Sequence, residues 1–278
     1  MTASAEIKAC CTAAYASPAA SWLLGSRFHP GGAALTERLI RCLAVGRGET
    51  VVDVACGLGE SSLQLAQATG ARVIGIDLSA DSVSEARRRA ERAGLEDKVE
   101  FLVADAEALP LADGAVAGVL CECSLCTFPD KERATAEIAR ILKPGGRLAL
   151  SDIVADADRL PAALRTLEAW VACLADARPL GGIIDLLRAA GLGLEVVERH
   201  DGALERLLEQ VDARLRLARA AGLGAEGDSG LIERGLDLSA SAREAVGRGI
   251  LGYVVVVARR PHGSAAATTG GVAASNLL

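Results

Sequence analysis

Short apolar runs alternate with amphipathic helical segments through the middle of the chain, and this alternation constrains the fold more than any other feature. We expect strands at 49–55, 71–76, 99–103, 117–120 and 147–150. We expect helices between them at 61–69, 79–93 and 131–142. Strands that alternate with helices are typical of a parallel sheet with crossover helices on its faces. The sequence therefore predicts an α/β fold with a doubly wound, mostly parallel sheet.

Helical patterns flank this region on both sides. We divide the chain into N-terminal helices, a core sheet, a helical C-terminal cap and a disordered tail. These segments cover residues 1–47, 48–154, 155–260 and 261–278. The cap contains two further expected strands, at 194–199 and 252–258, which we interpret as finishing the same sheet. The tail is expected to be disordered because its residues are small and polar.

The composition excludes several kinds of partner. The 278-residue chain has a formal net charge of −6 and no long Lys/Arg run, so nucleic-acid binding is not expected. No stretch reaches the roughly 18 apolar residues of a membrane-spanning helix, and the segment around Glu6 lacks the apolar core of a signal peptide. We therefore expect a soluble cytoplasmic protein, a monomer or weak dimer, whose eight cysteines are thiols or ligands rather than disulfides.

A loop of small residues follows the first expected strand and precedes a helix. It reads Asp53-Val-Ala55-Cys-Gly57-Leu-Gly59, so backbone N–H groups can approach a ligand closely at the strand-to-helix turn. We take Asp53, Ala55, Gly57 and Gly59 as ligand-binding candidates. A glycine-rich loop alone is also compatible with an ordinary tight turn, so the assignment depends on the residues that follow the next strands.

Two acidic residues end the next two strands. Asp77 lies about twenty residues after the loop, where a carboxylate can accept hydrogen bonds from two ribose hydroxyls. Asp105 ends the third strand, where an acid can accept a hydrogen bond from an adenine amino group while neighbouring backbone frames the ring. Ligands of open α/β sheets bind at the carboxyl ends of strands. We therefore add the neighbouring Leu78 and Ala106, and Cys121 at the end of the fourth strand, to the same site.

These motifs together resemble the successive motifs of class I S-adenosylmethionine-dependent methyltransferases. The matching segments within 49–154 read Val-Asp-Val-Ala-Cys-Gly-Leu-Gly, Ile-Asp-Leu-Ser, Ala-Asp-Ala-Glu-Ala-Leu-Pro and Leu-Lys-Pro-Gly-Gly-Arg-Leu-Ala-Leu-Ser-Asp. The resemblance implies a Rossmann-like core with S-adenosylmethionine as cofactor. The family usually has Gly where Ala55 stands, a departure expected to tighten the loop. A nicotinamide enzyme would share the loop and Asp77, but not the Asp105 segment or the Pro-Gly-Gly hairpin.

Three thiols, at Cys121, Cys123 and Cys126, lie within six residues directly after the fourth strand. Thiols at the mouth of a methyl-transfer site would suit a soft, thiophilic substrate. Glu122, between two of these thiols, is taken as a further site residue. Zinc is another ligand for such a cluster, but no partner Cys-x-x-Cys pair of the usual kind follows, so we assign no resident metal.

The thiol segment and a later segment together resemble arsenite methyltransferases. Cys123 stands six residues before a Pro-Asp-Lys motif, and Cys173 lies in the Trp-x-x-Cys context of 170–173. The resemblance implies that Cys123 and Cys173 are thiolates that hold trivalent arsenic beside the sulfonium methyl. Family members also use cysteines nearer the N-terminus, and Cys10 and Cys11 are the candidates for that role, although the local match is poor.

Other interpretations of these residues stay open. The family's Ser-Asn-Cys is Cys-Glu-Cys here, and Cys126 is an additional thiol. Free cysteines are often simply buried, which favours a packing role for Cys42 and Cys56 and competes with a site role at Cys121. His29 is compatible with a catalytic base or with a turn, and the turn is favoured.

The mechanism that the resemblance implies is direct displacement. The lone pair of a trivalent arsenic species, arsenite or methylarsenite, attacks the sulfonium methyl, and the protein contributes mainly proximity and orientation. A cellular thiol such as glutathione is the expected partner. Two alternatives remain: a methyltransferase for a small organic acceptor or thiol compound, and a non-catalytic metalloid-binding protein. Binding of S-adenosylmethionine would separate the last of these from the enzymes.

Overall fold

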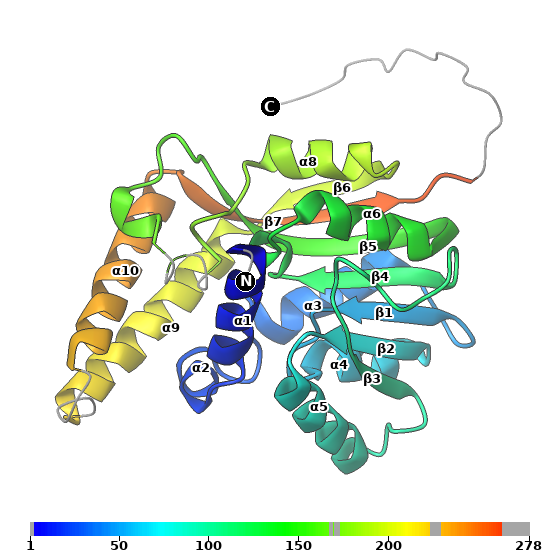
Figure 1. Cartoon of the computed structure of the whole chain (residues 1–278), viewed down its shortest axis with the longest axis horizontal. Coiled ribbons are helices and arrows are strands. Elements are labelled where there is room, and N and C mark those ends of the chain that lie inside the picture. The colour runs from blue at the N-terminus through cyan, green and yellow to red at the C-terminus, as the bar shows by residue number, and fades with distance from the viewer. Residues whose placement is uncertain (1–2, 167–168, 170–172, 223–228, 263–278) are drawn as a thin grey trace.

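A seven-stranded sheet runs through the computed structural model, which describes residues 3–166, 169, 173–222 and 229–262 (Figure 1). The strands are β1 (Thr50–Val54), β2 (Arg72–Asp77), β3 (Val99–Val103), β4 (Val116–Glu122), β5 (Leu142–Ala155), β6 (Gly193–Arg199) and β7 (Leu251–Arg259). Their order is β3-β2-β1-β4-β5-β7-β6. β1 to β5 pair in parallel, and β7 is antiparallel to both of its neighbours. The expected α/β fold with a mostly parallel, Rossmann-like sheet is therefore confirmed.

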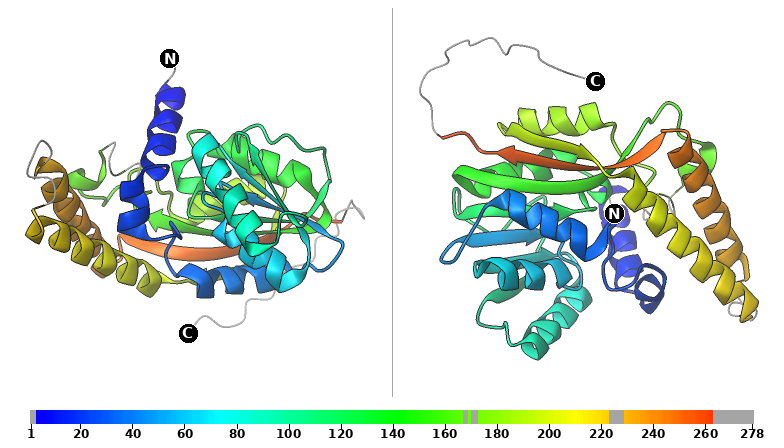
Figure 2. Two further views of the ribbon diagram at one scale, coloured as in Figure 1. Left: turned by 90° about the horizontal axis from the view of Figure 1, so that it is seen from below. Right: turned by 180° about the vertical axis from the view of Figure 1, so that it is seen from behind.

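Helices pack on both faces of the sheet, as the two further views show (Figure 2). The helices that flank the sheet are α3 (Gly32–Leu43), which precedes β1, and α4 (Glu60–Thr69), α5 (Ala80–Ala93), α6 (Lys131–Ile141) and α8 (Leu180–Ala189), which join strands. Successive residues of a strand point to opposite faces. Val51 of β1 accordingly lies in an apolar core with residues of α3, α4 and α5, and Val52 lies in a second core with residues of α6 and α8.

Local sequence signals fix the ends of the helices that frame the site. Ser79 caps the N-terminus of α5 by accepting a hydrogen bond from the Ser82 N–H at 3.1 Å. Asp130 caps α6 in the same way through the Arg133 N–H at 2.9 Å. Gly94 ends α5 in the left-handed conformation that glycine adopts without strain. The turns after β2 and β4 are thereby held at the carboxyl edge of the sheet.

Four helices lie beside the carboxyl ends of the parallel strands (Figure 1). α1 (Ala3–Tyr15) and α2 (Pro18–Leu24) precede the sheet. α9 (Asp201–Ala220) packs against α10 (Ser229–Gly247), and this helical hairpin extends away from the strands. Among the helices of the described residues, none is long and apolar enough to cross a membrane.

Two sequence expectations fall partly outside the described residues. The cap over 155–260 is expected to be helical, and its described part within 161–175 contains a 3-10 turn, η2 (Ala162–Leu164), while 167–168 and 170–172 are not described. The expected disordered tail begins at 261, but residues 263–278 lie outside the described part of the chain.

Candidate active site

A cavity opens at the carboxyl ends of β1, β2 and β4, with α1 forming one of its walls. The other walls come from residues 26–29, the small-residue loop after β1 and the segments after β3 and β4. It encloses about 1150 Å³ of empty space including its open mouth. The acidic residues that line it are Asp53, Glu60, Asp77, Asp105 and Glu122.

The small-residue loop is fixed by the next strand. The Cys56 N–H donates to the Ile76 carbonyl at 3.0 Å, and the Gly57 N–H donates to Asp77 Oδ2 at 2.8 Å. Ala55 and Gly57 line the cavity, and both have positive φ angles, 57° and 52°. Gly59 is not among the lining residues. Its φ is 81°, and a Cβ there would lie 2.6 Å from Phe101 Cζ, so close packing requires this glycine.

The two strand-end acids face the cavity but differ in their partners. Asp77 accepts the Gly57 N–H through Oδ2 and the Ser79 N–H through Oδ1, both at 2.8 Å, and burial raises the pKa of its carboxyl above its ordinary value. Asp105 instead pairs through Oδ2 with Lys8 Nζ of α1 at 2.7 Å. The neighbouring Leu78 and Ala106 also line the cavity.

Lys8 was not found by sequence reasoning. Its ammonium group contacts Asp105 and also Glu107, which is buried, so α1 is attached to the side of the cavity where the third strand ends. Glu107 also accepts the Asp130 N–H at 2.9 Å. A single lysine in an N-terminal helix has no local signature of this contact, because its partners lie about a hundred residues away in the chain.

Asp53 is buried at the inner end of the cavity, with 2% of its surface exposed. It accepts a hydrogen bond from Ser62 Oγ at 2.6 Å. Burial raises the pKa of its carboxyl to about 8, and Glu122 and Asp77 nearby act in the same direction. A carboxylate in this position would be stabilised by a cationic ligand, because a cation favours its charged form.

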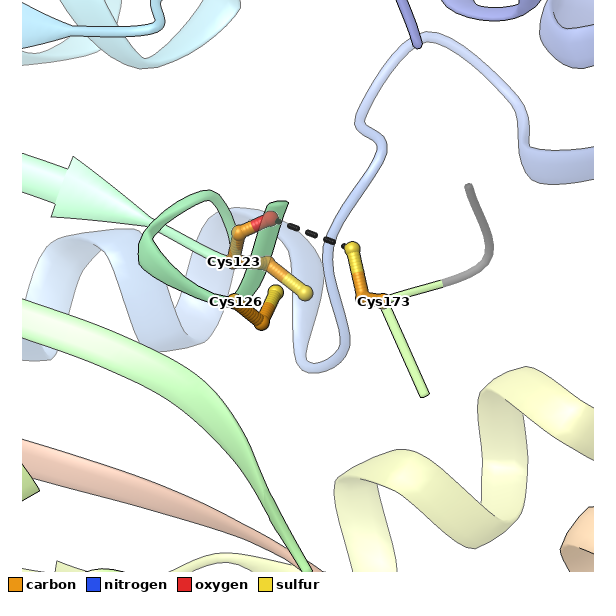
Figure 3. Close-up of side chains that lie close together, drawn as sticks. All are labelled: Cys123, Cys126 and Cys173. Atoms are coloured by element: carbon orange, nitrogen blue, oxygen red, sulfur yellow. Dashed lines mark hydrogen bonds between the residues drawn. The ribbon is translucent and has the colours of Figure 1, made fainter. Parts of the chain in front are cut away.

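Three thiols converge beside this cavity (Figure 3). The Sγ atoms of Cys123, Cys126 and Cys173 all lie within 4.8 Å of one another. Cys123 and Cys126 belong to the turn after β4, where Cys126 lies in the 3-10 turn η1 (Leu125–Thr127), and Cys173 approaches from a distant segment. The Cys173 thiol is 3.5 Å from the Cys123 carbonyl oxygen. Sulfurs at this separation can bind one soft atom together.

The electrostatics of the cluster favour one thiolate. Hydrogen bonds from Cys123 and Cys126 hold the pKa of the Cys173 thiol well below its usual range. Burial instead raises the pKa of the Cys126 thiol. Tyr15 of α1 lies with its hydroxyl 3.3 Å from Cys173 Sγ, so a further donor is available to the same sulfur. The thiolate is the form that acts as nucleophile and ligand.

The other cysteine candidates lie in different surroundings. Cys11 lines the cavity on α1, and burial raises the pKa of its thiol to about 11. Cys10, its neighbour, is exposed and does not line the cavity. Cys121 is fully buried in the second apolar core, with its Sγ 3.1 Å from Ser124 Oγ, and is not among the lining residues. Cys56 is also buried, and it lies at the cavity wall.

A buried polar group completes the inner end of the cavity. The side chains of His29 and Glu122 are 7% and 5% exposed, and His29 Nδ1 lies 3.7 Å from Glu122 Oε1. Thr36 donates to Glu122 Oε1 at 3.0 Å. Both His29 and Glu122 line the cavity next to Cys123.

Known proteins resemble the chain to different extents. Methyltransferase GfsG of Streptomyces halstedii is 43% identical over 123 residues, 44% of this chain and 44% of that protein, so the match spans less than half of GfsG. O-methyltransferase cnsE of Penicillium expansum is 32% identical over 231 residues, 82% of this chain and 78% of its own length. An arsenite methyltransferase of Halobacterium salinarum is 33% identical over 164 residues, 58% of this chain and 42% of that protein.

Solved structures share the fold. The [4+2]-cyclase SpnF superposes with a TM-score of 0.69 at 25% identity, over 82% of this chain and 81% of that chain. Phosphoethanolamine N-methyltransferase 2 of Haemonchus contortus, solved with S-adenosyl-L-methionine, superposes with a TM-score of 0.73 at 19% identity, over 87% of this chain and 56% of that chain.

The family model described as a methyltransferase domain matches residues 46–209, which is more than half of the 278-residue chain. That range contains the small-residue loop, the strand-end acids and all three clustered thiols. The match with cnsE extends over most of both proteins. The chain therefore belongs to the methyltransferase domain family.

Proposed function

We propose that this protein is an S-adenosylmethionine-dependent methyltransferase whose acceptor is a trivalent arsenic species, arsenite or methylarsenite, held by thiols. The observation that carries the proposal is the cluster of three sulfur atoms within 4.8 Å of one another. One of them, Cys123, also lines the cavity that the strand-end acids face. Trivalent arsenic is a soft centre that thiolates prefer to bind.

The proposed cofactor fits the groups that line the cavity. Asp77 would accept hydrogen bonds from the ribose hydroxyls, and Asp105 from the adenine amino group. The loop at Ala55 and Gly57 lets the backbone approach the ligand closely, because neither residue carries a side chain larger than a methyl group. Asp53, buried at the inner end, would face the positive end of the bound molecule.

Methyl transfer to arsenic needs little acid–base chemistry. The arsenic lone pair forms the new arsenic–carbon bond while the carbon–sulfur bond of the sulfonium breaks, and that electron pair stays on the departing sulfur. The thiolates of Cys123 and Cys173 would fix the arsenic atom beside the methyl group, so the catalytic contribution is proximity and orientation. Transfer would leave a four-coordinate arsonium, formally As(V), and loss of two of its bound sulfurs as a disulfide would return methylated As(III). Glutathione, as the cellular thiol, would deliver the arsenic and reduce that disulfide.

The test is an incubation of the purified protein with S-adenosylmethionine, reduced glutathione and arsenite, read by arsenic speciation chromatography. We expect methylated arsenic from the wild type, and a loss of about a hundredfold or more in Cys123→Ser and in Cys173→Ser, because each removes a ligand of the acceptor. Cys42→Ser, a thiol on α3 that does not line the cavity, is the matched control. Unchanged turnover in both site variants would refute the thiol assignment.

A hydroxyl acceptor is the second candidate, favoured by His29 and Glu122 at the cavity and by the match with an O-methyltransferase. A hydroxyl must lose its proton during transfer, and this pair could accept it. His29→Gln separates the two candidates. Arsenic methylation should survive the change within about threefold, because a lone pair needs no base. No arsenic product from the wild type, with cofactor binding intact, would instead direct the search to hydroxyl acceptors.

The remaining alternative is a metalloid-binding protein without catalysis. Isothermal titration with S-adenosylmethionine distinguishes it, since a carrier has no need of the donor site. Absence of binding by the wild type would favour the carrier and refute the proposal above.

A further inference from the structure

Lys131 is a buried cation beside the thiol cluster, with 1% of its side chain exposed. Its ammonium group donates to the Cys126 carbonyl at 3.1 Å and to the Phe128 carbonyl at 2.9 Å. It also forms an ion pair with Asp176. A lysine ammonium has three donors, and these three acceptors come from two different segments of the chain.

The two segments joined by Lys131 are those that carry the thiols. The carbonyl acceptors belong to the turn that holds Cys123 and Cys126. Asp176 lies three residues after Cys173, in the segment that brings the third sulfur to the cluster. A single side chain therefore connects the backbone of one thiol segment to a carboxylate of the other.

The location of Lys131 is unfavourable for a positive charge. Lys131 is the first residue of α6, and the positive end of a helix dipole disfavours a cation there. Burial adds a desolvation cost that only good partners offset. A purely structural connection between the two segments could be made by apolar packing without these costs, so the arrangement points to a role in which the relative position of the segments is critical.

The thiol segments need such fixation because their backbones are strained. Cys123 and Cys173 have φ angles of 51° and 65°, in the left-handed region that residues with a Cβ disfavour. Strained residues persist only when the surrounding structure holds them in place. Release of the Asp176 segment would allow Cys173 to relax and its sulfur to move away from Cys123.

We propose that Lys131 is the positioning residue of the thiol site: by binding Asp176 and the turn after β4 together, it sets the distance from Cys173 to the thiols of that turn. This role rests on the thiol acceptor site proposed above. The positioning role of Lys131 affects those ligands that thiols of both segments must bind at once.

The probe is phenylarsine oxide, whose arsenic has two exchangeable positions and so binds tightly where two thiols stand at a fixed distance. Two backgrounds isolate two thiol pairs, and both carry Cys10→Ser and Cys11→Ser. In the first, Cys126→Ser leaves Cys123 and Cys173, which come from different segments. In the second, Cys173→Ser leaves Cys123 and Cys126 on one turn. Bound arsenic is measured by equilibrium dialysis without S-adenosylmethionine.

Lys131→Met should weaken binding at least about tenfold in the first background and less than about twofold in the second. In the second background the change removes only the two hydrogen bonds that Lys131 donates to the turn, whereas in the first it also removes the connection to the other segment. Lys131→Arg should recover most of the binding, since it can still pair with Asp176. Lys143→Met, which removes a surface lysine paired with Glu49 at 2.7 Å, is the matched control.

Asp176→Asn is the second variant, because its side chain is 30% exposed and its replacement is easier for the fold to tolerate. Like Lys131→Met, it should weaken the binding of phenylarsine oxide in the first background. Equal effects in both backgrounds, or none in either, would overturn the positioning role. A wild type that does not bind phenylarsine oxide would refute the thiol acceptor site itself. Pair-specific binding without methyl transfer would refute the proposed enzymatic function and leave the role of Lys131 standing.

Discussion

Ala55, Cys123 and Cys173 have φ angles of 57°, 51° and 65°. Residues with a Cβ reach this region only at a cost of about 1–3 kcal/mol each. Ala55 lines the cavity, and the two cysteines belong to the thiol cluster. Three of the four non-glycine residues with positive φ in the described part of the chain therefore lie at the cavity or the thiol cluster, and the fourth, Ala44 at 50°, ends α3.

Asp53 makes stability depend on pH. Its pKa is raised by burial from an ordinary value of 3.8 to about 8. The folded protein keeps this proton up to about pH 8, whereas the unfolded chain releases it near pH 4, so the contribution to stability is complete below pH 4 and is lost as pH rises toward 8. Asp53→Asn removes the titration, and relative to the wild type it should gain stability from pH 5 to pH 8.

The measurement is the free energy of unfolding in urea across that pH range. Asp81→Asn, an exposed residue on α5, is the control and should follow the wild type. A constant difference between Asp53→Asn and the wild type at every pH would contradict the raised pKa.

At this scale the sequence identified the residues whose position follows from the sheet. Asp77 and Asp105 end strands, and the carboxyl ends of parallel strands meet at one edge, so their gathering could be predicted. The proximity of Cys123 and Cys173, fifty residues apart, was suggested by family resemblance alone. The sequence showed Cys126 only as an additional thiol. Residue spacing does not tell which side of a 3-10 turn faces a site, so its place in the cluster could not be predicted.

Among the elements, α1 lines the cavity and also contacts the thiol cluster. Lys8 Nζ lies 2.7 Å from Asp105 Oδ2. Further along the same helix, the Tyr15 hydroxyl lies 3.3 Å from Cys173 Sγ. The same helix thus touches both the proposed adenine site and the thiol cluster. Movement of α1 would open both at once.

Lys8→Met should loosen α1. Partly exposed ion pairs contribute up to about 1 kcal/mol, which corresponds to about fivefold in local opening. We expect amide hydrogen exchange to rise by about this factor across 4–15 and to stay unchanged in the sheet. Arg41→Met, which breaks an exposed pair with Glu37 on α3, should have no effect on α1. Unchanged exchange in Lys8→Met would mean that other contacts hold the helix.

Sequence reasoning found the elements with strong periodicity and missed α10 (Ser229–Gly247). Glycines at 230, 235 and 247 interrupt the apolar spacing of this helix, and glycine is a poor helix former. Its packing against α9 and the sheet supplies the stability that its own sequence lacks. The strands of the core, in contrast, carry apolar runs bounded by glycines and acids, which are local signals.

For the molecule as a whole, the proposed cofactor should act as a stabilising ligand. At S-adenosylmethionine about one hundred times its Kd, the folded state gains about 2.7 kcal/mol, and Tm should rise by about 5–10 °C. Asp77→Asn should nearly abolish this shift, because it weakens the hydrogen bonds to the ribose. Thermal unfolding monitored by circular dichroism gives the result, with the exposed Asp97→Asn as control. An equal shift in Asp77→Asn would place the ribose elsewhere.

β7 lies between β5 and β6, although it follows both in the chain. On the ribosome, β5 therefore has an open hydrogen-bonding edge from the time the core strands assemble until residues 251–259 emerge. Open strand edges are templates for pairing with other chains, and incomplete sheets are prone to aggregate during synthesis. A pause in translation between α10 and β7 would lengthen that exposure, so the yield of soluble protein should respond to codon choice in this short stretch.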